Sequence, residues 1–206
     1  MAITNYGQLK TAVADWLNRD DMASVIPTFI DLAHARVNRV LRVADMVQRT
    51  ETQLDSRFTQ VPADFLQMRA IQLRVTPTKA LEFLTAEQII QERSRLSDTA
   101  REPMFYSILG DTIEVMPTPD ATYELEISYY QDIPAMSADS DTNWLLTKAP
   151  SAYLYGALIE SAPYLAEDQR GLVWHELYTK CIEELMLEDE KSRFSGSTPI
   201  ARHRSL

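Results

Sequence analysis

The side chains best able to do acid–base or nucleophilic chemistry are few in this sequence and stand apart. It has three histidines, His34, His175 and His203, and one cysteine, Cys181. A nucleophile needs a base within hydrogen-bond reach, and none of the histidines lies in a recognisable catalytic motif. We interpret His34 and His175 as helix-surface residues with local partners. A small hydrolase with carboxylate chemistry is an alternative without a nucleophile, base or pocket signature, so we predict that the protein is not an enzyme.

Metal and phosphate chemistry is disfavoured as well. The lone Cys181 cannot form an intrachain disulfide, and no cysteine and histidine cluster predicts a zinc site, which favours a reducing compartment. The acidic run from Glu183 to Glu190 lacks the alternating oxygen ligands and the glycine of a calcium loop, so we interpret it as a solvated helix face. Five scattered glycines supply no phosphate-binding loop. We expect neither a metal nor a cofactor.

The charge balance argues against a general nucleic-acid binder. Thirty acidic and twenty basic side chains give a formal net charge of −10, which opposes the neutralisation of DNA phosphates over the whole surface. An acidic wall instead repels the DNA backbone at short range. This surplus would suit a protein that meets double-stranded DNA only as passing cargo and does not hold it.

The sequence predicts no membrane association. Residues 1–5 lack the basic and then apolar pattern of a signal peptide. No apolar run approaches the roughly 18 residues that are needed to span a bilayer. We expect a protein that stays soluble and is not secreted by this route.

Helical spacing of apolar residues marks both ends of the chain. It predicts a helix from Tyr6 to Asn18, with Thr4 or Asn5 as the N-cap, and a second helix with Pro27 in its first turn. After residue 141, Pro150 opens a helix that ends or kinks at Pro163. A long helix then begins at Glu167 and runs to about Lys191.

The middle of the chain is predicted to be rich in strands. Strands are expected over residues 46–54, 66–75 and 80–84, and a charged helix from Thr85 to about Leu96 begins with the capping box Thr85 and Gln88. Residues 104–130 are predicted to form a three-stranded meander whose first turn is Gly110-Asp111. Its last strand alternates between a buried and a wet face.

The C-terminal segment differs in charge from the helix before it. Eight acidic and three basic side chains lie between Glu167 and Lys191, a net charge of −5, whereas three arginines and no acid follow from Arg193 onward. This switch indicates a separate docking role for the tail. The predicted boundaries are 1–44 for an N-terminal helical part, 45–132 for a β-rich domain, 133–192 for a C-terminal helical part and 193–206 for an extended tail.

Three arginines form a row on the second helix. Arg36, Arg39 and Arg42 could contact DNA phosphates or pair with acids of a neighbouring helix or subunit, and the many acids of the chain favour pairing. We therefore predict intersubunit ion pairing by these residues. A DNA-binding regulator that uses the two N-terminal helices as a helix-turn-helix is the alternative, and the net charge opposes it.

Several strings together resemble the head-to-tail adaptor, or connector, proteins of short-tailed and related bacteriophages. Each string is weak alone, but their order and spacing extend over nearly the whole chain. They are residues 26–33 (IPTFIDLA) followed by the arginine row, residues 61–66 (VPADFL), 129–130 (YY), 142–146 (TNWLL), 153–158 (YLYGAL), 167–170 (EDQR) and 195–197 (SGS).

The resemblance implies an α+β fold, in which a helical bundle of N-terminal helices and two C-terminal helices carries an inserted antiparallel β domain and an extended C-terminal tail. It implies a structural virion protein, made in the host cytoplasm and located at the portal vertex. The partners would be the portal protein, a tail or nozzle protein, and further copies in a ring of twelve. The candidate portal-contact residues in the tail are Phe194, Pro199, Ile200, Arg202, Arg204 and Leu206.

Overall fold

The computed structural model describes residues 2–96, 99–165 and 170–193. These residues form six α-helices and two four-stranded sheets, which confirms the predicted α+β class. The chain divides into two compact units. The helical unit takes residues up to Asp45 and from Ile133 onward, and the β unit is Met46–Asp132.

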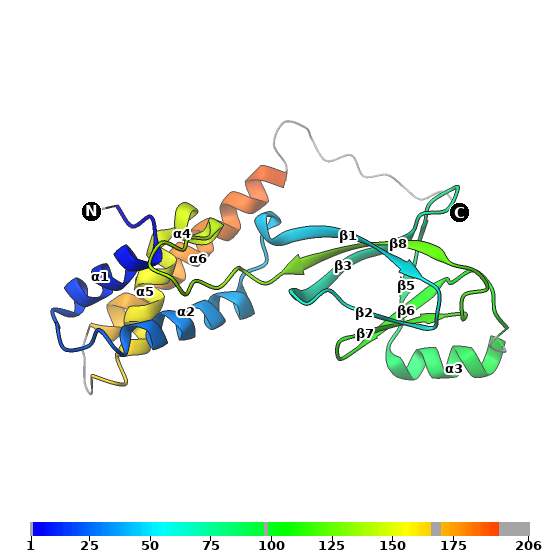
Figure 1. The fold of residues 1–206 in the computed structure, drawn as a ribbon, viewed down its shortest axis with the longest axis horizontal. Helices are drawn as coiled ribbons and strands as arrows, with labels where there is room; N and C mark the ends of the chain where they lie inside the picture. The colour runs from blue at the N-terminus through cyan, green and yellow to red at the C-terminus, as the bar shows by residue number, and fades with distance from the viewer. Residues whose placement is uncertain (1, 97–98, 166–169, 194–206) are drawn as a thin grey trace. The chain divides into compact units, whose positions relative to one another are not determined.

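The helical unit contains five of the described α-helices. Helix α5 lies at its centre, with the other helices packed against it (Figure 1). The helices are α1 (Tyr6–Leu17), α2 (Ile26–Val40), α4 (Trp144–Lys148), α5 (Pro150–Ser161) and α6 (Gly171–Arg193).

Local capping signals determine where these helices begin. Of the two N-cap candidates for α1, Asn5 is the cap, because its side chain accepts a hydrogen bond from the backbone N–H of Gln8 at 2.9 Å. Pro27 and Pro150 lie in the first turns of α2 and α5, as predicted. The predicted start of the last helix, at Glu167, lies outside the described residues.

A glycine allows three helices to meet. Gly156 on α5 faces Ala33 of α2 and Tyr178 of α6. A Cβ atom at position 156 would lie 2.9 Å from the Ala33 Cβ and 3.5 Å from the Tyr178 Cε2. Ala33 is fully buried and has no flexible end that could move aside. The close approach of α2 to α5 therefore requires a glycine at this point.

The β unit consists of two sheets and one helix. The first sheet has the strand order β1-β8-β3-β4, and the second has the order β2-β7-β6-β5. The strands are β1 (Val47–Leu54), β2 (Phe58–Gln60), β3 (Phe65–Leu73), β4 (Lys79–Ala80), β5 (Glu82–Phe83), β6 (Phe105–Leu109), β7 (Thr112–Met116) and β8 (Tyr123–Gln131), and the helix is α3 (Ala86–Leu96).

The two sheets share one hydrophobic core. Leu125 and Ile127 of β8 contribute from the first sheet, and Ile113 and Val115 of β7 contribute from the second. All four side chains are buried. The alternation along β8 thus puts its apolar side chains between the sheets, as the sequence pattern predicts.

The predicted meander is only partly correct. Strands β6 and β7 pair as an antiparallel hairpin, and Gly110 in the turn has φ +59°, a conformation that favours glycine. Strand β8, however, does not continue this sheet. It pairs with β1 along its whole length and with β3 on its other side. With a strand on each side, β8 pairs its backbone N–H and C=O groups in both directions. At the edge of a sheet, one row of these groups would stay unpaired.

Helix α3 begins where the sequence predicts. The backbone N–H of Thr85 donates to Gln88 Oε1 at 2.9 Å, and the backbone N–H of Gln88 donates to Thr85 Oγ1 at 3.3 Å. This confirms the predicted capping box. Arg93 on α3 and Arg57 both bind Glu114 of β7, at 2.8 and 2.6 Å, which fixes the helix against the second sheet.

The close approach at Gly156 gives the first testable prediction. Gly156→Ala should lower the free energy of unfolding by about 1–3 kcal/mol through overpacking, although alanine is the better helix former. Ala33→Gly should relieve the clash, so that the double variant is more stable than the sum of the two single changes. Urea unfolding of the four proteins measures this coupling, and strictly additive effects would contradict the contact.

The hydroxyl of Tyr129 gives a second prediction. It donates to Asp64 Oδ1 at 2.8 Å, and burial together with this bond raises the pKa of Tyr129 to about 12. Because the folded state holds the proton more tightly than the unfolded chain, this stabilisation is complete below about pH 10 and is lost as the pH rises towards 12. Urea unfolding should show that the free energy of unfolding falls less between pH 10 and pH 12 for Tyr129→Phe than for wild type. An equally steep loss in the variant would contradict the assignment.

Candidate functional site

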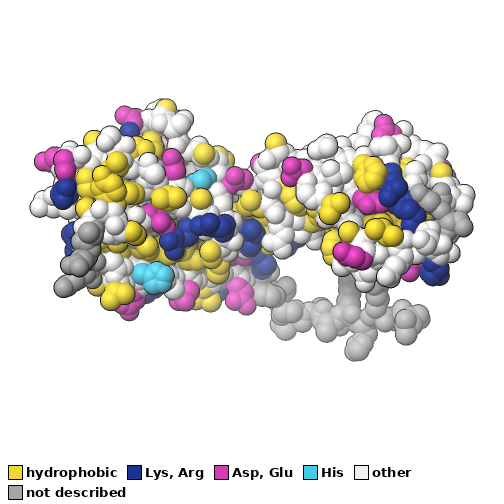
Figure 2. Space-filling view, turned by 90° about the horizontal axis from the view of Figure 1, so that it is seen from below, with side chains coloured by type: hydrophobic (Ala, Val, Ile, Leu, Met, Phe, Trp, Pro, Cys, Tyr) yellow, Lys and Arg dark blue, Asp and Glu magenta, His cyan; other side chains and the backbone are white. Residues whose placement is uncertain are grey.

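The arginine row lies on and just beyond α2. Figure 2 shows a row of basic side chains on one face of the helical unit. Arg36 binds Glu160 of α5 within the same chain, with its Nε donating to Glu160 Oε1 at 2.7 Å and its Nη2 donating to the same oxygen. Both side chains are partly shielded, with 33% and 18% exposed. Arg36 therefore pairs with an acid of a neighbouring helix and links α2 to α5.

Arg42 has a different role from Arg36. Its Nη1 donates to the backbone carbonyls of Asn38 at 2.7 Å and Leu41 at 2.5 Å. It thus satisfies carbonyl groups at the C-terminal end of α2, where a positive charge is favourable. Arg39, by contrast, is exposed. The prediction of intersubunit pairing now depends on Arg39 more than on its neighbours.

A buried tyrosine lies beside this row. Tyr178 of α6 is only 6% exposed, and its hydroxyl has no hydrogen-bond partner among the described residues. Burial raises the pKa of Tyr178, and the positive charges of Arg36 and Arg39 oppose that rise. The contact of its ring with Gly156 places this tyrosine at the meeting point of α2, α5 and α6.

A chain of hydrogen bonds joins α2 to α4 and α5 through a histidine. His34 Nδ1 lies 2.9 Å from the Tyr153 hydroxyl, and its Nε2 lies 3.0 Å from Asn38 Nδ2. Asn143 Nδ2 donates to the same hydroxyl at 2.8 Å. Asn38 Oδ1 also accepts from the backbone N–H of Ile133 at 3.1 Å. His34 is therefore partly buried in a polar network, a correction to the expected surface position.

The orientation of this network follows from its end. The backbone N–H of Ile133 can only donate, so it fixes Asn38 Oδ1 as the acceptor and Asn38 Nδ2 as the donor. His34 Nε2 must then accept, which leaves the proton of the neutral ring on Nδ1. His34 Nδ1 thus links α2 to α5, and Nε2 binds Asn38 of the same helix. The sequence alone did not predict this network, although Asn143 before residues 144–146 has the pattern of an N-cap.

One member of the acidic run is buried, contrary to the expected solvated face. Asp189 is only 9% exposed. Its Oδ1 accepts from the backbone N–H of Ala44 at 2.6 Å, and its Oδ2 pairs with Arg193 at 2.6 Å. Asp189 therefore connects the last turn of α6 with the segment after α2.

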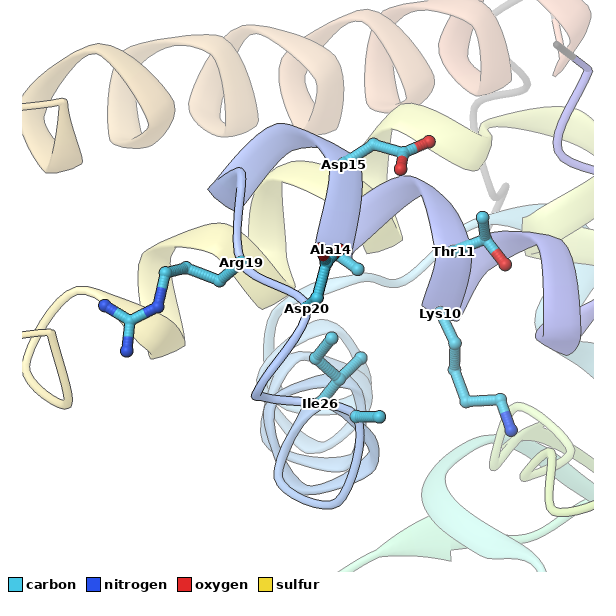
Figure 3. Close-up of a pocket in the computed structure, with 8 residues that line it drawn as sticks. Lys10, Thr11, Ala14, Asp15, Arg19, Asp20 and Ile26 are labelled. Carbon is cyan, nitrogen blue, oxygen red and sulfur yellow. The ribbon is translucent and has the colours of Figure 1, made fainter.

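A surface pocket between α1 and α2 does not gather reactive groups. Figure 3 shows that the side chains of Lys10 and Arg19 extend in different directions. Lys10 Nζ binds Asp139 at 2.5 Å, and Arg19 forms two hydrogen bonds of 2.8 Å with Asp21. Both cations are engaged outside the pocket. The pocket lining consists of Lys10, Thr11, Ala14, Asp15, Arg19, Asp20, Ala23 and Ile26.

The described part of the chain has neither a metal-binding cluster nor a membrane-spanning helix. Within residues 2–96, 99–165 and 170–193, no group of three or more histidine, cysteine, aspartate or glutamate side chains could hold a metal ion. Over the same ranges, no helix is both long and apolar enough to cross a membrane. The tail residues Phe194, Pro199, Ile200, Arg202, Arg204 and Leu206 lie outside the described residues.

Comparison with known families now identifies the class of protein. Residues 4–203 match the family described as SU10 adaptor protein. The match covers nearly the whole chain, so the chain belongs to the SU10 adaptor protein family. It is a bacteriophage adaptor protein and a virion component, which interacts with other components of the virion. None of the curated proteins matches the chain, and nothing favours the DNA-binding alternative.

The polar network gives a third prediction. Tyr153→Phe removes the hydroxyl that contacts His34 and Asn143, and should lower the free energy of unfolding by about 1–3 kcal/mol because buried polar groups lose a partner. Tyr155→Phe is the matched control. Tyr155 lies on the same helix and contacts Trp16 through its ring edge, which the change preserves. Urea unfolding compares the two variants, and equal losses would contradict a special role for Tyr153.

Proposed function

We propose that this chain is the head-to-tail adaptor of a short-tailed phage, a ring subunit that joins the portal protein to a tail or nozzle protein. The family match over residues 4–203 carries this proposal. The proposed arrangement is a helical bundle with the β unit inserted into it, repeated in twelve copies around a channel for double-stranded DNA. The ring would lie at the portal vertex of the virion.

The charge of the chain supports a channel that does not retain DNA. The net charge of −10 makes persistent binding to phosphates unfavourable. In the described part of the arginine row, Arg36 and Arg42 are used within the chain, for an ion pair and for backbone carbonyls. The protein would then guide DNA without competing for it.

The C-terminal segment is the proposed portal contact. It carries three arginines from Arg193 onward and no acid, after a helix of opposite net charge. It also contains Phe194, Ile200 and Leu206, whose burial on a partner is worth roughly 1.5–3 kcal/mol each. One such tail would bind weakly, but neighbouring tails in a ring bind at high effective concentration.

Deletion of residues 194–206 tests this proposal. The truncated protein should keep its folded helical signal and its thermal midpoint, and should no longer join portal rings in sedimentation or electron microscopy. A control with Phe194, Ile200 and Leu206 changed to Ser keeps the tail length and charge, and should also fail if the apolar contacts matter. Decoration of portals by the truncated protein would contradict the proposed tail contact.

A further inference from the structure

The outer face of α2 carries a continuous exposed seam. The four residues Thr28, Leu32, Ala35 and Arg39 follow one another at intervals of four, three and four residues, so they lie in one line along the helix. All four are exposed, and Leu32 has 46% of its surface accessible. We call these residues the α2 seam. The middle of the α2 seam consists of the apolar Leu32 and the small Ala35, and its C-terminal end carries the cation Arg39.

A second seam runs along the outer face of α6. Its members follow at intervals of four and three residues over more than four helical turns, and all are exposed. Leu172 has 83% of its surface accessible and Met186 has 37%. We call this set the α6 seam, and its members are Leu172, Glu176, Thr179, Glu183, Met186 and Glu190.

The α6 seam is hollowed as well as exposed. A shallow groove on α6 is lined by four members of the seam, Leu172, Glu176, Thr179 and Glu183, together with His175 and Lys180. Grooves between rows of side chains are where the ridges of another helix pack. The part of the α6 seam from Leu172 to Glu183 therefore has a hollow, and the whole seam has the spacing, that suit the packing of another helix.

The two seams carry opposite charges. Three glutamates recur every seven residues along the α6 seam, whereas the α2 seam ends in Arg39. Each seam has one neighbour of the other charge. The acidic Asp31 lies beside the α2 seam, and the basic Lys180 lies beside the α6 groove.

We propose that the occupant of the α6 seam is the α2 seam of a second copy of this chain. This inference rests on the proposed ring function and names the surfaces that would join its subunits. Each copy has both seams, so the contact uses two different surfaces and repeats from copy to copy, as a ring requires. Arg39 meets the glutamates of the α6 seam, and Leu32 packs against its apolar members Leu172 or Met186.

Charge reversal of the full-length chain tests this contact. Arg39→Glu and Glu183→Arg should each raise the dissociation constant for self-association by about tenfold or more, because like charges then face each other. The double variant R39E/E183R should recover association, since the pair is restored with reversed polarity. Sedimentation velocity over a range of protein concentrations measures this, with the chain alone and mixed with the portal protein.

A control on the same helix separates the seam from general electrostatics. Glu184 is exposed on α6 but lies off the seam, so Glu184→Arg should leave the dissociation constant unchanged. Equal weakening by Glu184→Arg would overturn the inference, as would a double variant that associates no better than the folded single variants. Self-association that depends on residues 194–206 instead of Arg39 would mean that the basic tail occupies the α6 seam, and would overturn it too.

The outcomes also separate this inference from the proposed function. If wild-type protein joins portal rings, and Arg39→Glu and Glu183→Arg both self-associate as wild type does, the seam contact is overturned and the adaptor function stands. Protein that self-associates through the seams and never joins a portal would overturn the adaptor function alone.

Discussion

The helical unit depends on the absence of a single Cβ atom at Gly156. Without a side chain there, Ala33 of α2 comes into van der Waals contact with the backbone of α5, and the ring of Tyr178 closes the same point from α6. Interiors are packed like crystals, so one additional methyl group at this point would force α2 or α5 to shift. The same point joins α2, which carries Arg36 and Arg39, to α5 and α6.

The polar network lies one turn away on the same helix. Tyr153 precedes Gly156 by three residues, so the close approach of α2 brings His34 within 2.9 Å of the Tyr153 hydroxyl. The bonds from Asn143 and Asn38 then set the positions of α4 and of Ile133. Apolar packing brings the helices together, and the directional bonds specify their register. His34 thus has a structural role, since both of its ring nitrogens take part in this network.

The features that could be predicted from sequence are those set by neighbours along the chain. The capping box at Thr85, the prolines that begin α2 and α5, and the turn at Gly110 depend on residues within a few positions, and all are confirmed. The partners of β8 could not be predicted, because alternation shows that one face is buried but not which strands lie beside it. The short α4 and β2 are below the length at which periodicity is informative. The roles of His34 and Asp189 depend on partners more than 100 residues away.

Asp189 joins two parts of the helical unit that lie far apart in the sequence. Its carboxylate holds Arg193 at the end of α6 and also the backbone N–H of Ala44, 145 residues earlier in the chain. The last turn of α6 and the segment after α2 therefore cannot separate without breaking the bond between the Ala44 N–H and Asp189 Oδ1. Their separation would also leave the carboxylate of a buried residue with one donor fewer, which is unfavourable for a charged group.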